Sequence, residues 1–316
     1  MASFFPAFGR NSLSGMALAA MAFALLTSVD TIFKLLAAGG HPTYQLVLIN
    51  ACFAMLPILL WTMATGGLTR LATARLPQHL ARGCASVLSA FAAVYAYSRL
   101  PLTDFYAIVF AGPLVVTAMA AFWLGESVEP ARWWAIALGF AGILIVTNPL
   151  ASPLLAVHKG EIHPQQIAGL LGRFAAFISV FCYALSVIMI RRMRGLETNL
   201  SFSFYGYLTA VLIGGALCLV RGMPDLSLSD VAHLALSGTI GGIASICMMT
   251  AYHRSPVALV APFQYTQIIW GALAGFLIWQ HVPSRHLIAG AAIVALSGLF
   301  VIYREMKGKE KYEIPH

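Results

Sequence analysis

The chain has 316 residues, of which 60% are hydrophobic and only 9% are charged. A soluble domain carries about 25% charged residues, so this composition excludes a water-exposed surface and predicts an all-helical integral membrane protein. The formal net charge of +8 is explained by basic residues that stay on one side of a membrane, and it gives no reason to expect a nucleic-acid partner.

Ten stretches are long and apolar enough to cross a bilayer, which takes about 20 residues of helix. Their runs are continuously apolar and rich in Ala and Leu, whereas strands of a membrane β-barrel alternate over about 10 residues. No small-residue cleavage pattern follows the first stretch, so we expect a retained helix rather than a signal peptide. The predicted spans are 13–38, 44–65, 79–99, 101–123, 131–149, 166–190, 199–220, 230–252, 256–279 and 286–303.

Basic residues predict the orientation, since Lys and Arg in short loops stay on the cytoplasmic side. With the N-terminus inside, 13 of the 19 Lys and Arg residues fall on the cytoplasmic side and four fall outside. We therefore expect a multi-pass protein of the bacterial inner membrane with both termini in the cytoplasm. The basic tail, residues 304–316, is expected to contact anionic lipid.

The sequence offers no motif for catalysis or for a cofactor. The five cysteines all fall inside apolar spans without paired spacing, which is typical of small buried side chains. The nine histidines lie mostly in loops or at span ends, and none forms an HExxH or another metal-ligand spacing. We expect no enzyme activity, no metal and no cofactor.

A short phrase occurs twice, 155 positions apart, as AYSRLP in residues 96–101 and AYHRSP in residues 251–256. Each copy joins one long apolar stretch to the next, so the chain is predicted to consist of two related halves of five spans. Because five is odd, the second half must enter the membrane from the opposite side. Inverted repeats are the architecture of many secondary transporters, with the substrate site near the midplane, whereas the alternative is a duplication in a protein that merely needs ten helices. The expected division is a first repeat 1–150, a linker 151–164, a second repeat 165–303 and a tail 304–316.

The same residues resemble a known family. Tyr97-x-Arg99-x-Pro101, a span, Gly125-Glu126 and then a span with Gly139 and Gly142 resemble the EamA repeat of the drug/metabolite transporter (DMT) superfamily, and residues 251–298 are similar to the second repeat of its bacterial members. The resemblance implies a 5+5 fold of ten helices with a central cavity lined by helices 1, 3, 4, 6, 8 and 9. The family includes bacterial carriers of riboflavin and S-adenosylmethionine. The second half departs from the pattern, because Gln280-His281 stands where the first half has Gly125-Glu126.

Ionisable side chains inside spans cost about 2.5 to 3.5 kcal/mol at the helix centre and mark candidate sites. Asp30 and Lys34 are four residues apart in the first span, in the favourable order for an intrahelical pair. We expect Asp30 to face the cavity, where its carboxylate binds a cationic group of the solute or carries a coupling proton. The alternative is that Lys34 extends to the outer interface while Asp30 neutralises it.

Asp104 lies in the first turn of the fourth span, where the helix N-terminus stabilises a carboxylate and Arg99 is within reach. Tyr106 and Phe110 follow near the same face, before a proline interrupts the helical hydrogen bonds. These two rings are expected to form a wall for a flat solute, with ordinary packing as the alternative. Tyr97, in the first copy of the repeated phrase, is included in the expected site.

Arg173 lies seven or eight residues into the sixth span. A guanidinium stays charged, so at this depth it must meet a carboxylate, backbone carbonyls, water or an anionic solute. We expect it to face the cavity, and the alternative is a span that begins further along the chain.

The ninth span contains, after Pro262, a run of polar and aromatic residues at 263–267 that lipid would not favour on an outer face. Gln264 and Gln267 are three residues apart and share a face suited to hydrogen-bond a heterocycle or a carboxylate. Tyr265 or Trp270 lies on neighbouring faces, and Phe263 completes this part of the expected site.

These features favour a secondary-active transporter that moves a small organic metabolite, such as an amino acid, a vitamin or a nucleoside-like compound, by alternating access. No ATP-binding motif is present, so a coupling proton or a counter-substrate would supply concentrative work. A membrane enzyme acting on lipid would need a cluster of acid, base or metal-ligand side chains, and a channel would need a continuous polar stripe; the scattered single residues favour neither. The expected partners are the solute, the lipid bilayer and, as one option, a second copy of the chain in a homodimer.

Overall fold

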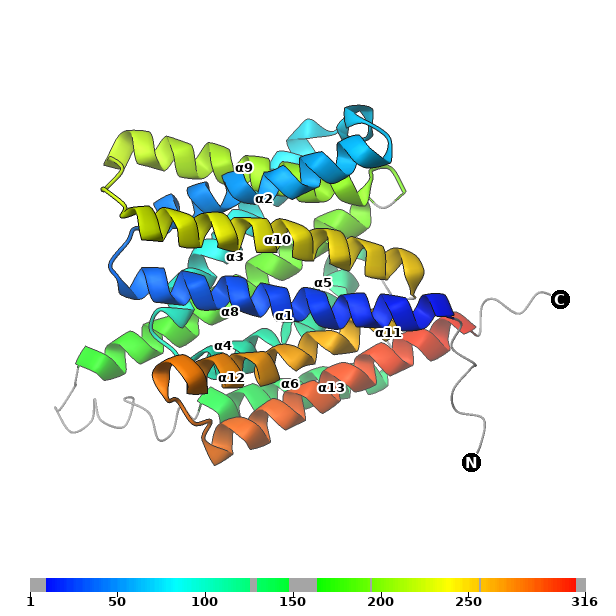
Figure 1. Cartoon of the computed structure of the whole chain (residues 1–316). Coiled ribbons are helices and arrows are strands. Elements are labelled where there is room, and N and C mark those ends of the chain that lie inside the picture. The colour runs from blue at the N-terminus through cyan, green and yellow to red at the C-terminus, as the bar shows by residue number, and fades with distance from the viewer. Residues whose placement is uncertain (1–9, 126–129, 148–163, 194, 256, 311–316) are drawn as a thin grey trace.

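The computed structural model describes residues 10–125, 130–147, 164–193, 195–255 and 257–310, and within them the chain forms a bundle of helices (Figure 1). Helix is found at each of the ten ranges predicted to span the membrane. The helices are α1 (Arg10–Ala38), α2 (Thr43–Thr65), η1 (Leu68–Leu71), α3 (Leu76–Tyr97), α4 (Leu102–Val109), α5 (Gly112–Leu124), α6 (Pro130–Thr147), α8 (Pro164–Arg192), α9 (Asn199–Arg221), α10 (Leu228–Arg254), α11 (Val257–Val260), η2 (Ala261–Thr266), α12 (Gln267–Trp279) and α13 (Arg285–Glu310).

The helical surfaces are suited to lipid. Within the described ranges, seven segments are long and apolar enough to cross a membrane, counting α4 and α5 as one, and α6 and α13 contain shorter apolar stretches. Large apolar side chains lie on the outside of several helices, and Leu219, Phe122 and Trp134 are each at least 77% exposed. Exposure of this kind would cause aggregation in water but is stable in hydrocarbon. The chain is therefore a multi-pass membrane protein.

Two of the predicted spans are broken. The fourth is divided into α4 and α5 at Phe110, shortly before Pro113, because a proline has no N–H to donate and its ring collides with the preceding turn. The ninth is divided into α11, the 3-10 helix η2 and α12, with Pro262 inside η2. Irregular backbone at membrane depth is tolerated where protein covers it. Both breaks meet this condition, since η2 packs against α1 and α4 packs against α12.

The bundle has two ends, which we name after residues that lie there. The Lys34 end contains the last residues of α1, α3 and α12 and the first residues of α8 (Figure 1). The His79 end contains the first residues of α3 and α9 and the last residues of α8. Figure 1 shows that α1 begins and α13 finishes at this same end.

The packing of the helices leaves a central layer that holds the polar residues. The helix α2 lies between α9 and α10, α10 packs against α1, α3 packs against α8 and α9, and α6 pairs with α13. The largest apolar cluster joins these layers and includes Phe33, Tyr97, Tyr106 and Phe110, each at most 6% exposed. Within this packing Lys34 of α1 is buried, and Asp30 of α1 and Asp104 of α4 are partly buried.

The helices α5 and α12 end in the same backbone conformation. Gly125 has a φ of 66° and Gln280 has a φ of 55°, so both residues are left-handed. Glycine adopts this conformation without steric cost, whereas any other residue is strained there. Gln280 thus keeps the helix-ending turn although it departs from the glycine of the first half. Glu126 lies outside the described residues.

Candidate functional site

Asp30 and Tyr106 form a partly buried hydrogen bond between α1 and α4. The hydroxyl of Tyr106, which is 1% exposed, donates to Oδ2 of Asp30 at 2.8 Å. The ring of Tyr106 lies against Gly271 of α12, where an added Cβ would lie 2.6 Å from the ring. A carboxylate inside protein is costly unless it is hydrogen-bonded, so this contact both stabilises Asp30 and brings three helices together.

Lys34 lies one turn further along α1 and is only 7% exposed. Its ammonium donates hydrogen bonds to the backbone oxygens of Tyr97 and Leu100, where α3 ends and its last carbonyls have no partner within the helix. The ring of Trp279 lies 5.2 Å from Nζ, within the range of a cation–π interaction. Lys34 therefore connects α1 with α3 and α12.

Asp104, in the first turn of α4, lies among basic side chains from distant parts of the chain. It interacts electrostatically with Arg173 of α8, His281 after α12 and Lys34 of α1. The close approach of α8 explains the interaction with Arg173, because a Cβ on Gly172 would lie 3.0 Å from Leu100 Cγ. The expected site residues Asp104 and Arg173 are thus brought together.

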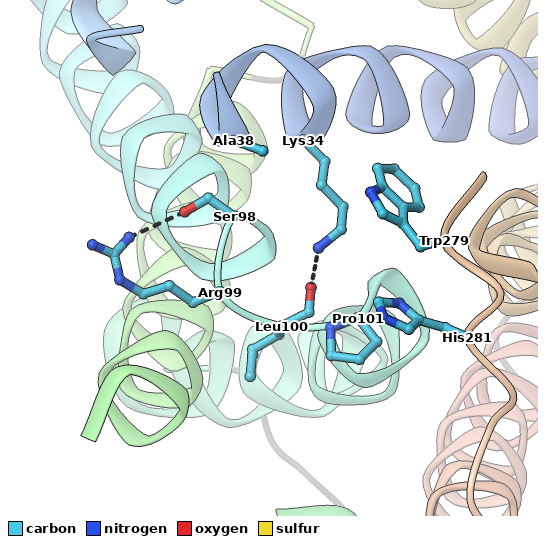
Figure 2. Close-up of a pocket in the computed structure, with 8 residues that line it drawn as sticks. All are labelled: Lys34, Ala38, Ser98, Arg99, Leu100, Pro101, Trp279 and His281. Carbon is cyan, nitrogen blue, oxygen red and sulfur yellow. Dashed lines mark hydrogen bonds between the residues drawn. The ribbon is translucent and has the colours of Figure 1, made fainter. Parts of the chain in front are cut away.

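Arg99 was expected to be within reach of Asp104, and the structure gives it other partners. Its Nη1 donates to Ser98 Oγ at 3.1 Å, and its guanidinium carbon lies 3.6 Å from the centroid of the Tyr95 ring. Figure 2 shows the guanidinium pointing away from Lys34. The sequence spacing favoured Arg99 because it is close to Asp104 along the chain. In the folded chain α8 packs against α4, and Arg173 of α8 interacts with Asp104 instead.

A cavity of 330 Å³ opens beside Lys34 at the Lys34 end. It is lined by the segment 98–101, by Lys34 and Ala38 of α1, and by Trp279 and His281 (Figure 2). The rings of Trp279 and His281 are nearly parallel, with 15° between their planes and 6.5 Å between their centroids. Sequence reasoning missed both residues. The only signal was the departure at Gln280-His281 from the pattern of the first half.

The aromatic and amide residues of the expected site line the breaks in the two divided spans. Phe110 meets the edge of Tyr265 at 4.9 Å between centroids, with 82° between the planes. The hydroxyl of Tyr265 is buried without a hydrogen-bond partner. Gln264 faces Gly112, where an added Cβ would lie 3.9 Å from Nε2, and Gln267 is 7% exposed.

Two residues of the expected site lie apart from the others. Phe263 packs on a small cluster of Ala19, Ala251 and Val260. Trp270 is 39% exposed on the surface of α12, where an aromatic ring suits the lipid environment.

The arrangement can bind a solute but offers little for chemistry. Partly buried carboxylates, an ammonium, a guanidinium and aromatic rings can together hold an ionised group and a planar ring. Among the described residues, no group of three or more His, Cys, Asp or Glu side chains could hold a metal ion.

Comparisons with known proteins agree with this picture. The profile of the EamA-like transporter family matches residues 13–148 and again residues 170–304. A riboflavin transporter of Rhizobium johnstonii is 27% identical over 74% of this chain and 72% of its own length, and an S-adenosylmethionine uptake transporter of Rickettsia bellii is 25% identical over 89% and 91%. A pseudopaline exporter of Pseudomonas aeruginosa is 24% identical over 93% and 98%. One crystal structure, 18% identical, covers 92% of this chain and 98% of its own with a TM-score of 0.60, which supports the fold alone.

Proposed function

The chain belongs to the EamA-like transporter family, and we propose that it is a secondary-active transporter that moves a small organic metabolite across the bacterial inner membrane by alternating access. The proposed solutes carry a planar or amphipathic part together with an ionised or polar group, as vitamins and nucleoside-like compounds do. Relatives named for riboflavin and S-adenosylmethionine support this class.

One observation carries the proposal: ionisable side chains from both halves gather at the Lys34 end. Lys34 of the first half and His281 of the second line the cavity, and Asp104 interacts electrostatically with both of them and with Arg173. Asp30 lies one turn before Lys34 on α1. Placing ionised groups inside a membrane protein is costly, and such groups face bundle interiors or solute pathways. A protein that merely needed ten helices would have no reason to retain them.

The packing of the helices supports two halves related by a twofold axis in the membrane plane. Such an axis would exchange α1 with α8, α2 with α9 and α3 with α10. In agreement, α1 packs against α10 as α8 packs against α3, and α2 packs against α10 as α9 packs against α3. The remaining close pairs, α2 with α9 and α6 with α13, would each join equivalent helices. We infer a 5+5 inverted repeat.

The two copies of the repeated phrase support the same axis. A Cβ on Gly172 of α8 would lie 3.0 Å from Leu100 Cγ in the first copy, and a Cβ on Gly15 of α1 would lie 2.9 Å from Ser255 Cβ in the second. The first helix of each half therefore packs closely against the copy of the phrase in the other half. The two contacts lie at opposite ends of the bundle, where an alternating mechanism requires contacts that open in turn.

Basic residues support the orientation. Arg70, Arg75, Arg192 and Arg254 lie at the His79 end, which we therefore assign to the cytoplasm. Solute would enter or leave the cavity beside Lys34 from the outer side.

The test is exchange of labelled solute in proteoliposomes, with riboflavin and S-adenosylmethionine as the first probes. A carrier shows uptake that is stimulated by solute on the opposite side, and this readout works for importers and exporters. A channel would give conductance and an enzyme would give a chemical product. Lack of stimulated exchange for every solute that raises the thermal stability of the purified protein would contradict the proposal.

A site variant makes the test specific. Tyr106→Phe removes the donor to Asp30, and a hydrogen bond to a charged group contributes about 1.5 to 3 kcal/mol. We expect the apparent solute affinity to fall about tenfold or more. Asp225→Asn changes a carboxylate exposed in the loop before α10 and serves as the matched control, with exchange equal to that of the wild type.

A further inference from the structure

A second buried polar cluster lies at the His79 end, away from the proposed solute site. His79 of α3 is 0% exposed, and its Nε2 lies 3.3 Å from Oε2 of Glu197, the residue two before α9. The other carboxylate oxygen of Glu197 accepts a hydrogen bond from Thr73 Oγ1 at 2.6 Å. The side chain of Glu197 is 5% exposed, so both members of the pair are shielded from water.

The surroundings of the imidazole are aromatic. Its ring centroid lies 5.3 Å from that of Phe202 and 4.7 Å from that of Tyr205, both in α9. Nε2 of His79 faces Glu197, whereas Nδ1 is buried and has no hydrogen-bond partner among the described residues. A buried polar atom without a partner costs about 1 to 3 kcal/mol, and a ring in this position is therefore poorly explained by packing alone.

Within the described part of the chain, the electrostatic influences on His79 come from Glu197 and Arg82. Glu197 attracts a proton to the ring, and Arg82, one turn further along α3, repels it. Arg82 is 5% exposed and donates to Phe202 O at 2.6 Å. Arg70 donates instead to Thr65 O. Of the remaining basic residues on the neighbouring elements, Arg192 donates to Trp123 O on α5, and Arg75 lies at the first residue before α3.

The charges of Glu197 and Arg82 make the packing of α3 against α9 sensitive to protonation of His79. With neutral His79, Glu197 carries a negative charge beside Nε2 and Arg82 carries a positive charge one turn further along α3, so the three side chains have no net charge. Protonation adds a net positive charge in a region from which water is excluded, where an uncompensated charge is costly. Separation of α3 from α9 would admit water and remove that cost, so the protonated ring favours the open form.

We propose that His79 is a proton-binding site whose occupancy favours opening of the His79 end between α3 and α9. The inference rests on the proposed transport function, because a transporter with this site would open to the His79 side in response to proton concentration. The proton moves from water at the His79 end onto an imidazole nitrogen and returns to the same water on closing. No other reactant is needed.

Hydrogen–deuterium exchange of the purified full-length chain tests the site without relying on transport. Amide protection in residues 76–82 and 197–205, corrected for the intrinsic rate, is compared between about pH 5 and pH 8, the range in which a histidine titrates. In the wild type we expect protection to fall about fivefold or more at the lower pH, a modest allosteric coupling. His79→Gln, which keeps a polar side chain that cannot titrate, removes this dependence.

The controls separate the site from a structural role. His253→Gln changes an exposed histidine at the same end and is expected to behave as the wild type. Glu197→Gln removes the attracting charge, so the transition moves to lower pH but persists. Equal protection at both pH values in the wild type, or the same loss of protection in His79→Gln, would overturn the proposal.

A parallel exchange assay in proteoliposomes keeps the two hypotheses distinguishable. If the wild type exchanges solute normally but its amide protection does not change between the two pH values, the proton site alone is overturned. An intact protection change in a protein that exchanges no solute overturns the transport function and leaves the site in place.

Discussion

At the scale of single residues, Lys34 illustrates how one charge is stabilised inside a membrane protein. Its ammonium meets the free carbonyls at the end of α3 and the face of Trp279. Each of these partners attracts a cation, and together they replace the water that the ammonium loses. The same contacts hold the end of α1 to the first copy of the repeated phrase.

Replacement of Lys34 by methionine tests this stabilisation. Lys34→Met keeps most of the side-chain volume but leaves the oxygens of Tyr97 and Leu100 without a donor. A buried acceptor without a partner costs about 1 to 3 kcal/mol, so we expect a lower thermal unfolding temperature in detergent. Arg99→Met changes a neighbouring cation that is exposed, and it should shift the unfolding temperature much less. Equal shifts for the two variants would contradict the role of Lys34.

The left-handed residue at the end of α12 gives a second prediction. Non-glycine residues pay about 1 to 2 kcal/mol for this conformation, so Gln280→Gly should raise the thermal unfolding temperature, with the gain reduced by the greater freedom of glycine in the unfolded chain. Gly125→Ala at the end of α5 should lower it by a similar free energy. Both variants are measured in the same thermal unfolding assay, and a destabilising Gln280→Gly would show that the glutamine side chain makes contacts worth more than the strain.

At the scale of elements, hydropathy alone predicted where the helices lie, because spanning a bilayer imposes a length and composition that are local properties of the chain. Prolines likewise indicated the break in the fourth span. The αL turn at Gln280 was not predictable, since only glycine gives a sequence signal for a positive φ. The family resemblance drawn from the repeated phrase was confirmed by two profile matches.

Partners of the charged residues were harder to predict than the residues themselves. Asp30, Lys34, Asp104 and Arg173 stood out because charges are rare in apolar spans. Their contacts depend on which helices pack together, and those helices are distant in sequence. His79 was grouped with histidines at span ends, because nothing along the chain pointed to Glu197.

The close approach of α8 to the first copy of the phrase gives a prediction about helix packing. At Gly172 an added Cβ would lie 3.0 Å from Leu100 Cγ, whereas at Gly169, one turn earlier in the same helix, no atom lies within 4 Å. Overpacking costs about 1 to 3 kcal/mol, so Gly172→Leu should lower the thermal unfolding temperature and slow solute exchange. Gly169→Leu is the matched control and should change neither quantity, and similar effects of both variants would contradict the packing argument.

At the scale of the whole molecule, the repeated phrase places equivalent residues at the two ends of the bundle. Ser98 is the third residue of the first copy and His253 is the third residue of the second. In the proposed mechanism the contact beside one copy opens while the contact beside the other closes. If the two halves are related by such an axis, the accessibility of residue 98 and that of residue 253 must change in opposite directions during transport.

Cysteine labelling measures this relation directly. Ser98→Cys and His253→Cys are made separately in a chain without its native cysteines, and the reaction with a membrane-impermeant maleimide is followed with and without solute. We expect Ser98→Cys to react from outside the cell and His253→Cys only after permeabilisation, because the proposed orientation has the His79 end in the cytoplasm. A solute that favours one state shifts the populations of both, so one labelling rate should rise and the other should fall. Rates that rise or fall together would describe a general loosening of the bundle and would contradict alternating access.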